Sequence, residues 1–377
     1  MKNKYIFFFI GTEAELIKLF PIIVECYKQK LPYKVIASGQ NDINKSQIIK
    51  LIDCINVDLE LSKEESIKKS AVGLLTWWLY TLSVALKQIN DKFYDVQFDN
   101  SIMVVHGDTV STYMGAEIGK KLGMRVCHVE AGLRSHNIFN PFPEEIDRML
   151  TSRCCTVHFA PGDEAVVNLS KAHGIVIDTK HNTLIDSLEY SYSISSETDF
   201  SSFFNKKFFV FVIHRQENLA NKKLVEEIVA EIERASANMT CVIVLHEITK
   251  NTFIKLGILE RLKENNNIIL LPRVNYFDFM KLLNRSEYVI TDGGSNQEEL
   301  YYMGKPCLIM RKNTERNEGI GENAVLFDGT IFSVRRFIEE YKKYEKEAVI
   351  KEDSPSLIIA KQLRIELKSE MELNGKG

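Results

Sequence analysis

Short apolar segments alternate with amphipathic stretches along most of this 377-residue chain. Residues 5–10, 102–105 and 208–213 are short enough to be buried strands, and stretches such as 15–28 and 222–235 have helical spacing. This alternation is typical of parallel sheets joined by crossover helices. A chain of this length exceeds what one hydrophobic core usually supports, so the sequence predicts two such units.

The fold class that we predict is α/β, with two Rossmann-like domains facing across a cleft. We place the N-terminal domain at residues 1–180 and the C-terminal domain at residues 190–350, and the polar, Ser-rich stretch around 178–199 is the predicted connection. A helix near residues 355–372 is expected to pack back onto the first domain. Ligands of such proteins bind between the two units.

Composition narrows the possible functions. A formal net charge of -3 without a Lys/Arg-rich face disfavours nucleic acid as a partner. No run of about 18 apolar residues occurs, so no membrane span is expected. The N-terminal apolar run is too short for a secretory signal. Seven cysteines without a CxxC pair fit buried thiols in a reducing compartment, so we expect a cytoplasmic protein.

Acidic residues follow strands in the first half. Asp108 comes after the apolar run 102–105, Glu130 ends the run 126–129, and Glu144 lies directly behind a Pro-Phe-Pro segment. The carboxyl ends of parallel strands face one shared crevice, so these acids can converge. Several carboxylates in one crevice predict proton abstraction and return.

Lys18 lies one turn into the helix that follows Gly11 and could reach an anion in the cleft, although an ordinary surface lysine is equally compatible. In the second half, His214 and Arg215 directly follow the strand 208–213, and His246 ends the next strand. An imidazole and a guanidinium at strand ends suit a diphosphate, whereas a lone histidine there is commonly structural. No His/Asp/Glu cluster has the spacing of metal ligands, so no metal is expected.

A second glycine turn, Gly293-Gly294-Ser295, follows a strand and opens a helix. Backbone N–H groups and the helix dipole at such a turn attract phosphate. Glu298 or Glu299 in that helix could accept both hydroxyls of a ribose, or both could simply stabilise the start of the helix. A third basic loop at the end of a strand contains Arg316. Neither half has the G-x-G-x-x-G pattern, so no nicotinamide or flavin cofactor is expected.

Together these segments resemble the non-hydrolysing UDP-N-acetylglucosamine 2-epimerases, from about residue 8 to about residue 326. The combination of motifs is specific, whereas any one of them alone is not. The matching motifs are His106-Gly107-Asp108-Thr109, His128-Val129-Glu130-Ala131-Gly132-Leu133-Arg134, Pro141-Phe142-Pro143-Glu144-Glu145, His214-Arg215, Gln297-Glu298-Glu299 and Thr314-Glu315-Arg316.

The resemblance implies a GT-B-like pair of domains that interconverts UDP-GlcNAc and UDP-ManNAc, or a close analogue, without a cofactor. In that family UDP leaves anti to the C2 proton, a 2-acetamidoglucal forms, and UDP adds back while a proton is delivered to the opposite face. The resemblance implies catalytic roles for Asp108, Glu130 and Glu144, and we assign His214 to the catalytic residues as a donor to the departing diphosphate. It also implies a homodimer. The residues that we assign to substrate binding are Lys18, Arg134, Arg148, Arg215, His246, Gly293, Gly294, Ser295, Glu298, Glu299 and Arg316.

Several positions depart from the family pattern. Glu13 stands where the family has an arginine in its first glycine loop, and Asn41 stands where it has a histidine. In bacterial members that region takes part in binding a second, activating UDP-GlcNAc. The sequence therefore predicts that such activation is weak or absent.

Two other functions stay open on the sequence. A glycosyltransferase of the same two-domain fold would also bind a UDP-sugar donor, and fold alone does not separate it from an epimerase. A non-catalytic sugar-nucleotide sensor is the third reading. The presence of Asp108, Glu130 and Glu144 together counts against the sensor.

Overall fold

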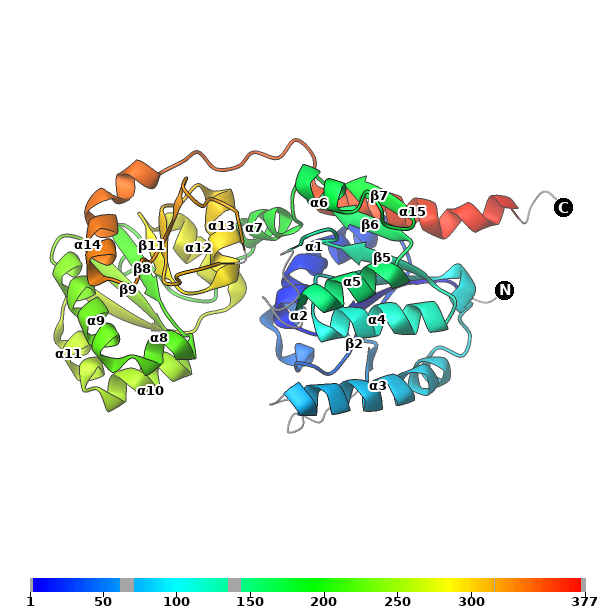
Figure 1. The fold of residues 1–377 in the computed structure, drawn as a ribbon, viewed down its shortest axis with the longest axis horizontal. Helices are drawn as coiled ribbons and strands as arrows, with labels where there is room; N and C mark the ends of the chain where they lie inside the picture. Colours follow the sequence, from blue (N-terminus) through cyan, green and yellow to red (C-terminus); the bar gives the residue numbers. More distant parts are fainter. Residues whose placement is uncertain (1–2, 62–70, 135–143, 315, 374–377) are drawn as a thin grey trace. The chain divides into compact units, whose positions relative to one another are not determined.

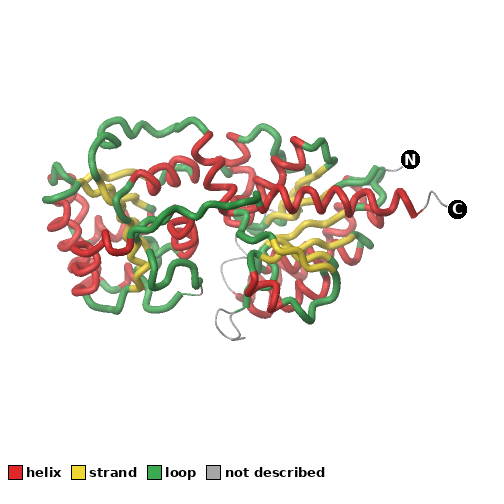
Figure 2. Tube along the Cα trace, turned by 90° about the horizontal axis from the view of Figure 1, so that it is seen from above, coloured by secondary structure: helices red, strands yellow, loops and turns green. Residues whose placement is uncertain are grey.

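The computed structural model describes residues 3–61, 71–134, 144–314 and 316–373 (Figure 1). It divides into two compact units, one formed by Met1–Ser187 with Lys351–Gly377 and the other by Leu188–Ile350. In each unit the strands are flanked by helices (Figure 2). The predicted α/β class with two Rossmann-like domains is confirmed.

The first unit contains a seven-stranded sheet with the order β3-β2-β1-β4-β5-β6-β7, in which every pairing is parallel. Every residue of β1 and β4 is buried, which explains their continuous apolar runs. The strand order reverses between β1 and β4, where α/β proteins form their ligand crevice. The strands are β1 (Ile6–Ile10), β2 (Tyr33–Ala37), β3 (Leu59–Glu60), β4 (Ile102–His106), β5 (Arg125–Val129), β6 (Val157–Ala160) and β7 (Ile175–Asp178).

The helices of this unit cover the sheet and include the last helix of the chain. They are α1 (Glu13–Lys28), η1 (Ile43–Lys45), α2 (Gln47–Leu51), α3 (Ala71–Lys92), η3 (Phe98–Asn100), α4 (Val110–Lys121), α5 (Glu144–Cys154), α6 (Asp163–Asn168) and α15 (Pro355–Leu373). Helix α7 (Leu184–Ser193) begins in this unit and ends in the second one. Helix α15 packs against α1. Helix α7 lies within the stretch that the sequence predicted as a polar connection; it forms because Leu184, Ile185 and Leu188 are buried along one side of it.

The second unit repeats the pattern with a six-stranded parallel sheet of order β10-β9-β8-β11-β12-β13. Its core includes Phe209, which stacks on Tyr288 at 4.7 Å between ring centroids. The strands are β8 (Phe208–Val212), β9 (Thr240–Leu245), β10 (Ile268–Pro272), β11 (Val289–Thr291), β12 (Cys307–Ile309) and β13 (Ala324–Leu326). The helices are α8 (Gln216–Ala220), α9 (Lys222–Ser236), α10 (Glu247–Lys255), α11 (Ile258–Glu264), α12 (Tyr276–Arg285), α13 (Gly294–Met303), α14 (Ile331–Glu340) and η4 (Tyr341–Tyr344).

Within the described residues, none of the helices has the length and apolar character needed to cross a bilayer.

Asp186 in the first turn of α7 holds the start of α15. Its carboxylate pairs with Lys351 and accepts hydrogen bonds from the Ser354 hydroxyl at 3.0 Å and the Ser356 backbone N–H at 2.7 Å. Asp186 is 8% exposed, so these donors compensate a largely buried charge. The Asp186 side chain therefore ties together the two segments that connect the units, which are α7 and the segment that leads into α15.

We predict that Asp186→Ala lowers the free energy of unfolding by about 2–3 kcal/mol, because buried donors lose a charged acceptor. Urea unfolding followed by circular dichroism would measure the loss. The matched control is Asp353→Ala, an exposed acid in the same returning segment. That control should stay within about 0.5 kcal/mol of the wild type. Equal stability of the two variants would contradict a role for Asp186 in holding α15.

His128 in β5 is a buried imidazole that supports the turn after β4. Its Nε2 lies 2.7 Å from the carbonyl oxygen of Gly107, so that nitrogen carries the proton and donates it. Gly107 has φ of +72°, a conformation that glycine adopts without strain. Burial lowers the pKa of His128 to about 3 from its ordinary value of 6.5. The imidazole is therefore neutral in the folded protein.

This buried imidazole predicts acid sensitivity. Below pH 6.5, His128 binds a proton in the unfolded chain but not in the folded protein. The free energy of unfolding therefore falls as the pH drops towards 3. His128 accounts for about 2 kcal/mol of the loss in the free energy of unfolding between pH 6.5 and pH 5. The His128→Asn variant can still donate to Gly107 but has no imidazole to protonate. In urea unfolding, its free energy of unfolding should fall by about 2 kcal/mol less than that of the wild type over this pH range. The exposed His173→Asn is the control and should keep the wild-type dependence. An unchanged dependence in His128→Asn would show that this imidazole is not the source.

Candidate functional site

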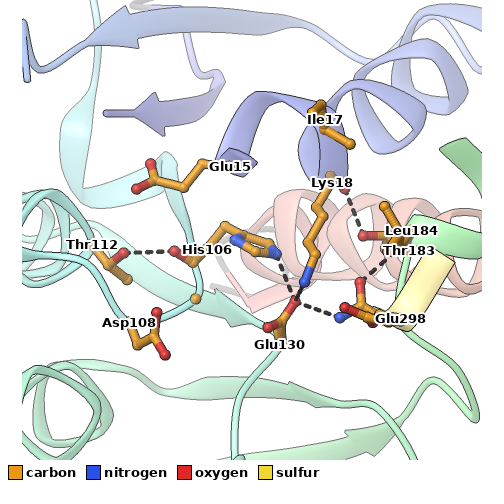
Figure 3. A network of polar contacts seen from close by, with 12 residues as sticks. Glu15, Ile17, Lys18, His106, Asp108, Thr112, Glu130, Thr183, Leu184 and Glu298 are labelled. Carbon is orange, nitrogen blue, oxygen red and sulfur yellow. Dashed lines mark hydrogen bonds and ion pairs between the residues drawn. The ribbon is translucent and has the colours of Figure 1, made fainter. Parts of the chain in front are cut away.

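Glu130 follows β5 directly and occupies a strained backbone conformation. Its φ of +62° lies in the left-handed region, which costs a residue with a side chain of order 1–3 kcal/mol. The turn brings its carboxylate to Lys18 from α1, with which it forms an ion pair, and to Asn182, whose amide donates to it (Figure 3). The Nε2 atom of His106 lies 3.2 Å from the same carboxylate oxygen.

This cluster is almost inaccessible to water. The side chains of Lys18 and Glu130 are 6% and 9% exposed, and that of His106 is 5% exposed. A carboxylate at such a site is tolerated only when positive charge and hydrogen bonds replace its hydration. Lys18, which the sequence assigned to an anionic substrate, is thus the partner of Glu130 in this structure.

Glu15 is a second buried carboxyl group beside this cluster and had no role in the sequence-based prediction. Its carboxyl oxygens accept from the Gly11 backbone N–H at 2.7 Å and from the Thr109 hydroxyl at 2.6 Å. Burial raises the pKa of Glu15, against the effect of these hydrogen bonds. Because Thr109 follows Asp108 directly, Glu15 ties the loop after β1 to the turn that carries Asp108.

Asp108 lies one residue beyond the turn glycine after β4, and β4 pairs with the strand that Glu130 follows. The two acids therefore come from neighbouring strand ends, and Figure 3 draws them on either side of His106. The Asp108 side chain is 30% exposed and forms an ion pair with Arg148 of α5. Asp108 is thus the more accessible of the two carboxylates, since Glu130 is 9% exposed.

Glu145, the second residue of α5, forms ion pairs with two arginines. Its side chain is fully buried and contacts Arg134 Nε at 2.5 Å and Arg148 Nη1 at 3.3 Å. Arg134 and Arg148 were both predicted to bind substrate, and both are held by this acid. Glu144 is the first residue of α5, and its side chain lies outside the described residues.

In the second unit, Asp292 at the end of β11 organises the loop after β8. Its buried carboxylate accepts from the backbone N–H groups of His214 at 3.0 Å and Arg215 at 2.9 Å, and from the Asn218 amide at 3.0 Å. Burial alone would raise the pKa of Asp292, but the bonds from His214, Arg215 and Asn218 outweigh it and hold the pKa below its ordinary value. Asp292 is therefore ionised.

The two predicted histidines of this unit lie together. The rings of His214 and His246 stack at 4.6 Å between centroids, and Nδ1 of His214 lies 3.1 Å from Asp292. Burial, with the nearby charges of His214 and Arg273, lowers the pKa of His246 to about 4, so this ring is neutral near pH 7. The guanidinium of Arg215 contacts Glu217 at 3.2 Å on the surface.

Helix α13 begins at the predicted glycine turn. Gly293 is its N-cap and Gly294 its first residue, no side chain caps this end, and Ser295 is exposed. The backbone N–H groups of the first turn can therefore receive an anion. Asn296 donates to Glu299 at 2.8 Å.

Gln297 in the first half of α13 fixes the loop that contains Arg316. Its buried amide donates to the carbonyl oxygens of Arg316 at 3.0 Å and Glu318 at 2.9 Å, and accepts from the Thr314 hydroxyl at 2.9 Å. The Arg316 guanidinium forms an ion pair with Glu298, which is 1% exposed. Glu298 thus anchors the loop that contains Arg316.

Sequence reasoning did not single out Glu15, Asn182 or Asn218, and it used His106 only as part of a motif. Glu15 had a local signal, because Thr12 three residues earlier is the N-cap of α1 and accepts from its backbone N–H at 3.2 Å. Asn182 and Asn218 had none, since an isolated asparagine is usually a turn or cap residue. Within the described ranges, no group of three His, Cys, Asp or Glu residues could hold a metal ion.

Comparisons with known proteins identify the family of this chain. A family model described as UDP-N-acetylglucosamine 2-epimerase matches residues 25–352. A putative UDP-N-acetylglucosamine 2-epimerase from Thermotoga maritima is 30% identical over 355 residues, which cover 90% of this chain and 89% of that protein.

Solved structures point the same way. The structure of UDP-GlcNAc 2-epimerase from Methanocaldococcus jannaschii superposes with a TM-score of 0.77 at 26% identity, covering 96% of this chain and 99% of that one. The enzyme from Neisseria meningitidis bound to UDP-GlcNAc superposes with a TM-score of 0.74 at 28% identity, covering 98% and 100%. The resemblance read from the motifs is confirmed, and the chain belongs to the UDP-N-acetylglucosamine 2-epimerase family.

Proposed function

We propose that this protein inverts C2 of a UDP-linked 2-acetamido sugar and interconverts UDP-GlcNAc and UDP-ManNAc or a close analogue. The observation that carries the proposal is the pair of carboxylates at neighbouring strand ends. Glu130 is buried against Lys18, His106 and Asn182, and Asp108 is paired with Arg148. Family membership supports the same reaction, and a homologue from Neisseria meningitidis binds UDP-GlcNAc.

The proposed reaction is an elimination followed by an addition. A carboxylate takes the proton from C2, the electrons of the C2–H bond form a C1=C2 double bond, and the C1–O bond to the diphosphate breaks on the opposite face. UDP and a 2-acetamidoglucal result. Addition of UDP to C1, with proton delivery to the other face of C2, gives the epimer and requires acid/base groups on both faces of the ring.

The acids Asp108, Glu130 and Glu144 fill these roles in the proposal. Lys18 and the Asn182 amide hold the carboxylate of Glu130 in place, and a carboxylate is a weak base. A weak base can remove an unactivated C2 proton only as the leaving group departs, which fits a concerted elimination. His106 beside Glu130 offers a second group through which the proton can pass.

The second unit supplies the groups that receive UDP in the proposal. Nδ1 of His214 lies 3.1 Å from Asp292, and the imidazolium form of this ring has an Nε2–H to donate to the departing diphosphate. The uncapped first turn of α13 supplies backbone N–H groups for the same anion. Glu299 accepts the ribose hydroxyls.

The test is turnover of UDP-GlcNAc in heavy water, read by proton NMR. We expect deuterium at C2 of substrate and product alike, because the abstracted proton exchanges with solvent. Glu130→Gln and Glu144→Gln should each lose at least about 100-fold in exchange and epimerisation, since a general base is removed. Both should still bind UDP in calorimetry. The control is Glu117→Gln in α4, an acid of the same unit whose carboxylate pairs with Lys121.

Wild-type exchange in either variant would remove that acid from the mechanism. Absence of exchange and epimer with UDP-GlcNAc and several related UDP-sugars would refute the proposed function. Transfer of the sugar to an added acceptor, without exchange at C2, would indicate a glycosyltransferase.

Regulation by a second nucleotide sugar is expected to be weak or absent. Glu13 in the first turn of α1 accepts a hydrogen bond from the Ser46 hydroxyl at 2.7 Å, so a carboxylate stands where the family has an arginine. A carboxylate there repels a diphosphate. We expect the rate with UDP-ManNAc alone to follow a hyperbola, unchanged by small amounts of UDP-GlcNAc. A sigmoidal curve that becomes hyperbolic on adding UDP-GlcNAc would contradict this.

A further inference from the structure

A continuous series of hydrogen bonds joins the glycine turn before α13 to the carboxylate of Glu299. The Gly293 backbone N–H donates to the Thr291 hydroxyl at 3.0 Å, and that hydroxyl donates to the Asn296 amide oxygen at 3.0 Å. The Asn296 amide nitrogen then donates to Glu299 Oε2 at 2.8 Å. Neither Thr291 nor Asn296 has a role in the proposed function.

The direction of this series is fixed by chemistry. A carboxylate can only accept, so the amide nitrogen of Asn296 faces Glu299 and the amide oxygen faces Thr291. Glu299 is 2% exposed, so the orientation of its carboxylate depends on such donors and not on water. An amide donor also differs from an ionic one, because it orients the carboxylate without cancelling its charge.

The glycine turn is shaped around the Asn296 side chain. A Cβ atom at Gly293 would lie 2.4 Å from the Asn296 amide oxygen, far inside contact distance. The φ of Gly293 is −77°, which any residue can adopt. A side chain at position 293 would therefore displace the Asn296 amide, so the turn and this amide are packed against each other.

The neighbouring acid is held in a different way. Glu298 forms an ion pair with Arg316, whose loop is fixed by Gln297. The two adjacent acids therefore serve different purposes, because Glu298 anchors a loop while Glu299 is oriented by the turn. Burial, with a smaller effect of the charge of Glu299, raises the pKa of Tyr276.

We propose that Asn296 is a positioning residue for ribose recognition, which it couples to the anion-binding turn at the start of α13. This inference rests on the proposed function, in which Glu299 accepts the ribose hydroxyls. Asn296 holds one oxygen of Glu299 and sets the plane of the carboxylate. It does so from a side chain that also supports Gly293, so a diphosphate seated on the turn and a ribose on Glu299 meet one prearranged surface.

The experiment compares UDP with 2′-deoxy-UDP by isothermal titration calorimetry. The wild type should bind UDP at least about tenfold more tightly, because the deoxy nucleotide lacks a hydrogen bond to a charged acceptor. Asn296→Asp keeps the shape and the acceptor for Thr291 but replaces the donor to Glu299 with an oxygen. In that variant, and in the isosteric Asn296→Leu, the preference for UDP should fall below about threefold.

Two further variants make the readout specific. Glu299→Gln should abolish the preference in the same way, because its carboxylate is the proposed ribose acceptor. Glu298→Gln is the matched control: it should weaken both nucleotides alike through the Arg316 loop and keep the wild-type preference. Thermal unfolding of each variant reports folding separately from the ratio.

Each outcome decides a different statement. If both Asn296 variants keep the wild-type preference while Glu299→Gln loses it, the positioning role is overturned and the ribose role of Glu299 stands. If Glu299→Gln keeps the preference, or the wild type has none, the proposed ribose contact fails and the inference fails with it. Should Asn296→Asp fail to fold, Asn296→Leu alone carries the comparison, since it removes both amide contacts without adding charge.

Discussion

The buried ion pair between Lys18 and Glu130 is the interaction on which the first unit's site depends. Two charges with less than a tenth of their side chains exposed lose most of their hydration, and their mutual attraction offsets that loss only with good geometry and further hydrogen bonds. Asn182 and His106 complete the surroundings of the carboxylate. The left-handed backbone of Glu130 adds a further cost. A site that serves stability alone has no reason to accept these costs, which is why the cluster indicates function.

The second unit reaches the same end with a different arrangement. Asp292 is fully buried, and its donors are mainly backbone N–H groups and an amide instead of a lysine. Its charge is therefore held by fixed dipoles of the loop that carries His214. In both units one buried carboxylate at a strand end fixes the loops around it. In the first unit the buried carboxylate is Glu130 itself, whereas in the second unit the buried carboxylate of Asp292 orients the imidazole of His214.

Much of the fold could be predicted because its strands are buried on both faces. Continuous apolar runs such as those of β1, β4 and β8 are visible in the sequence and sufficed for the α/β class. Helix α7 was less visible, since its buried residues are separated by polar ones. The positions of the acids at strand ends followed from the same pattern. Their partners did not, because Lys18 and Glu130 are 112 positions apart and no local pattern links them.

The ion pairs of the basic side chains affect how a nucleotide sugar would bind. All five lysine and arginine side chains that the sequence assigned to substrate binding lie within ion-pair distance of an acid: Lys18 with Glu130, Arg134 with Glu145, Arg148 with Asp108, Arg215 with Glu217 and Arg316 with Glu298. A diphosphate therefore meets cations whose charge is already compensated. A diphosphate gains favourable interactions in one of two ways. It displaces an acid from its cation, or it binds to hydrogen-bond donors that are not paired with an acid.

The second route is the better match for these residues. The uncapped turn of α13 offers backbone N–H groups and a helix dipole, and neither depends on a counterion. Displacement is easiest at Arg215, whose pair with Glu217 lies at the surface, where such pairs are worth about 1 kcal/mol or less. It is hardest at Lys18, where it would leave Glu130 buried without its cation. The cations and the backbone thus have different roles, because the cations hold the acids in place and the backbone N–H groups bind the phosphate.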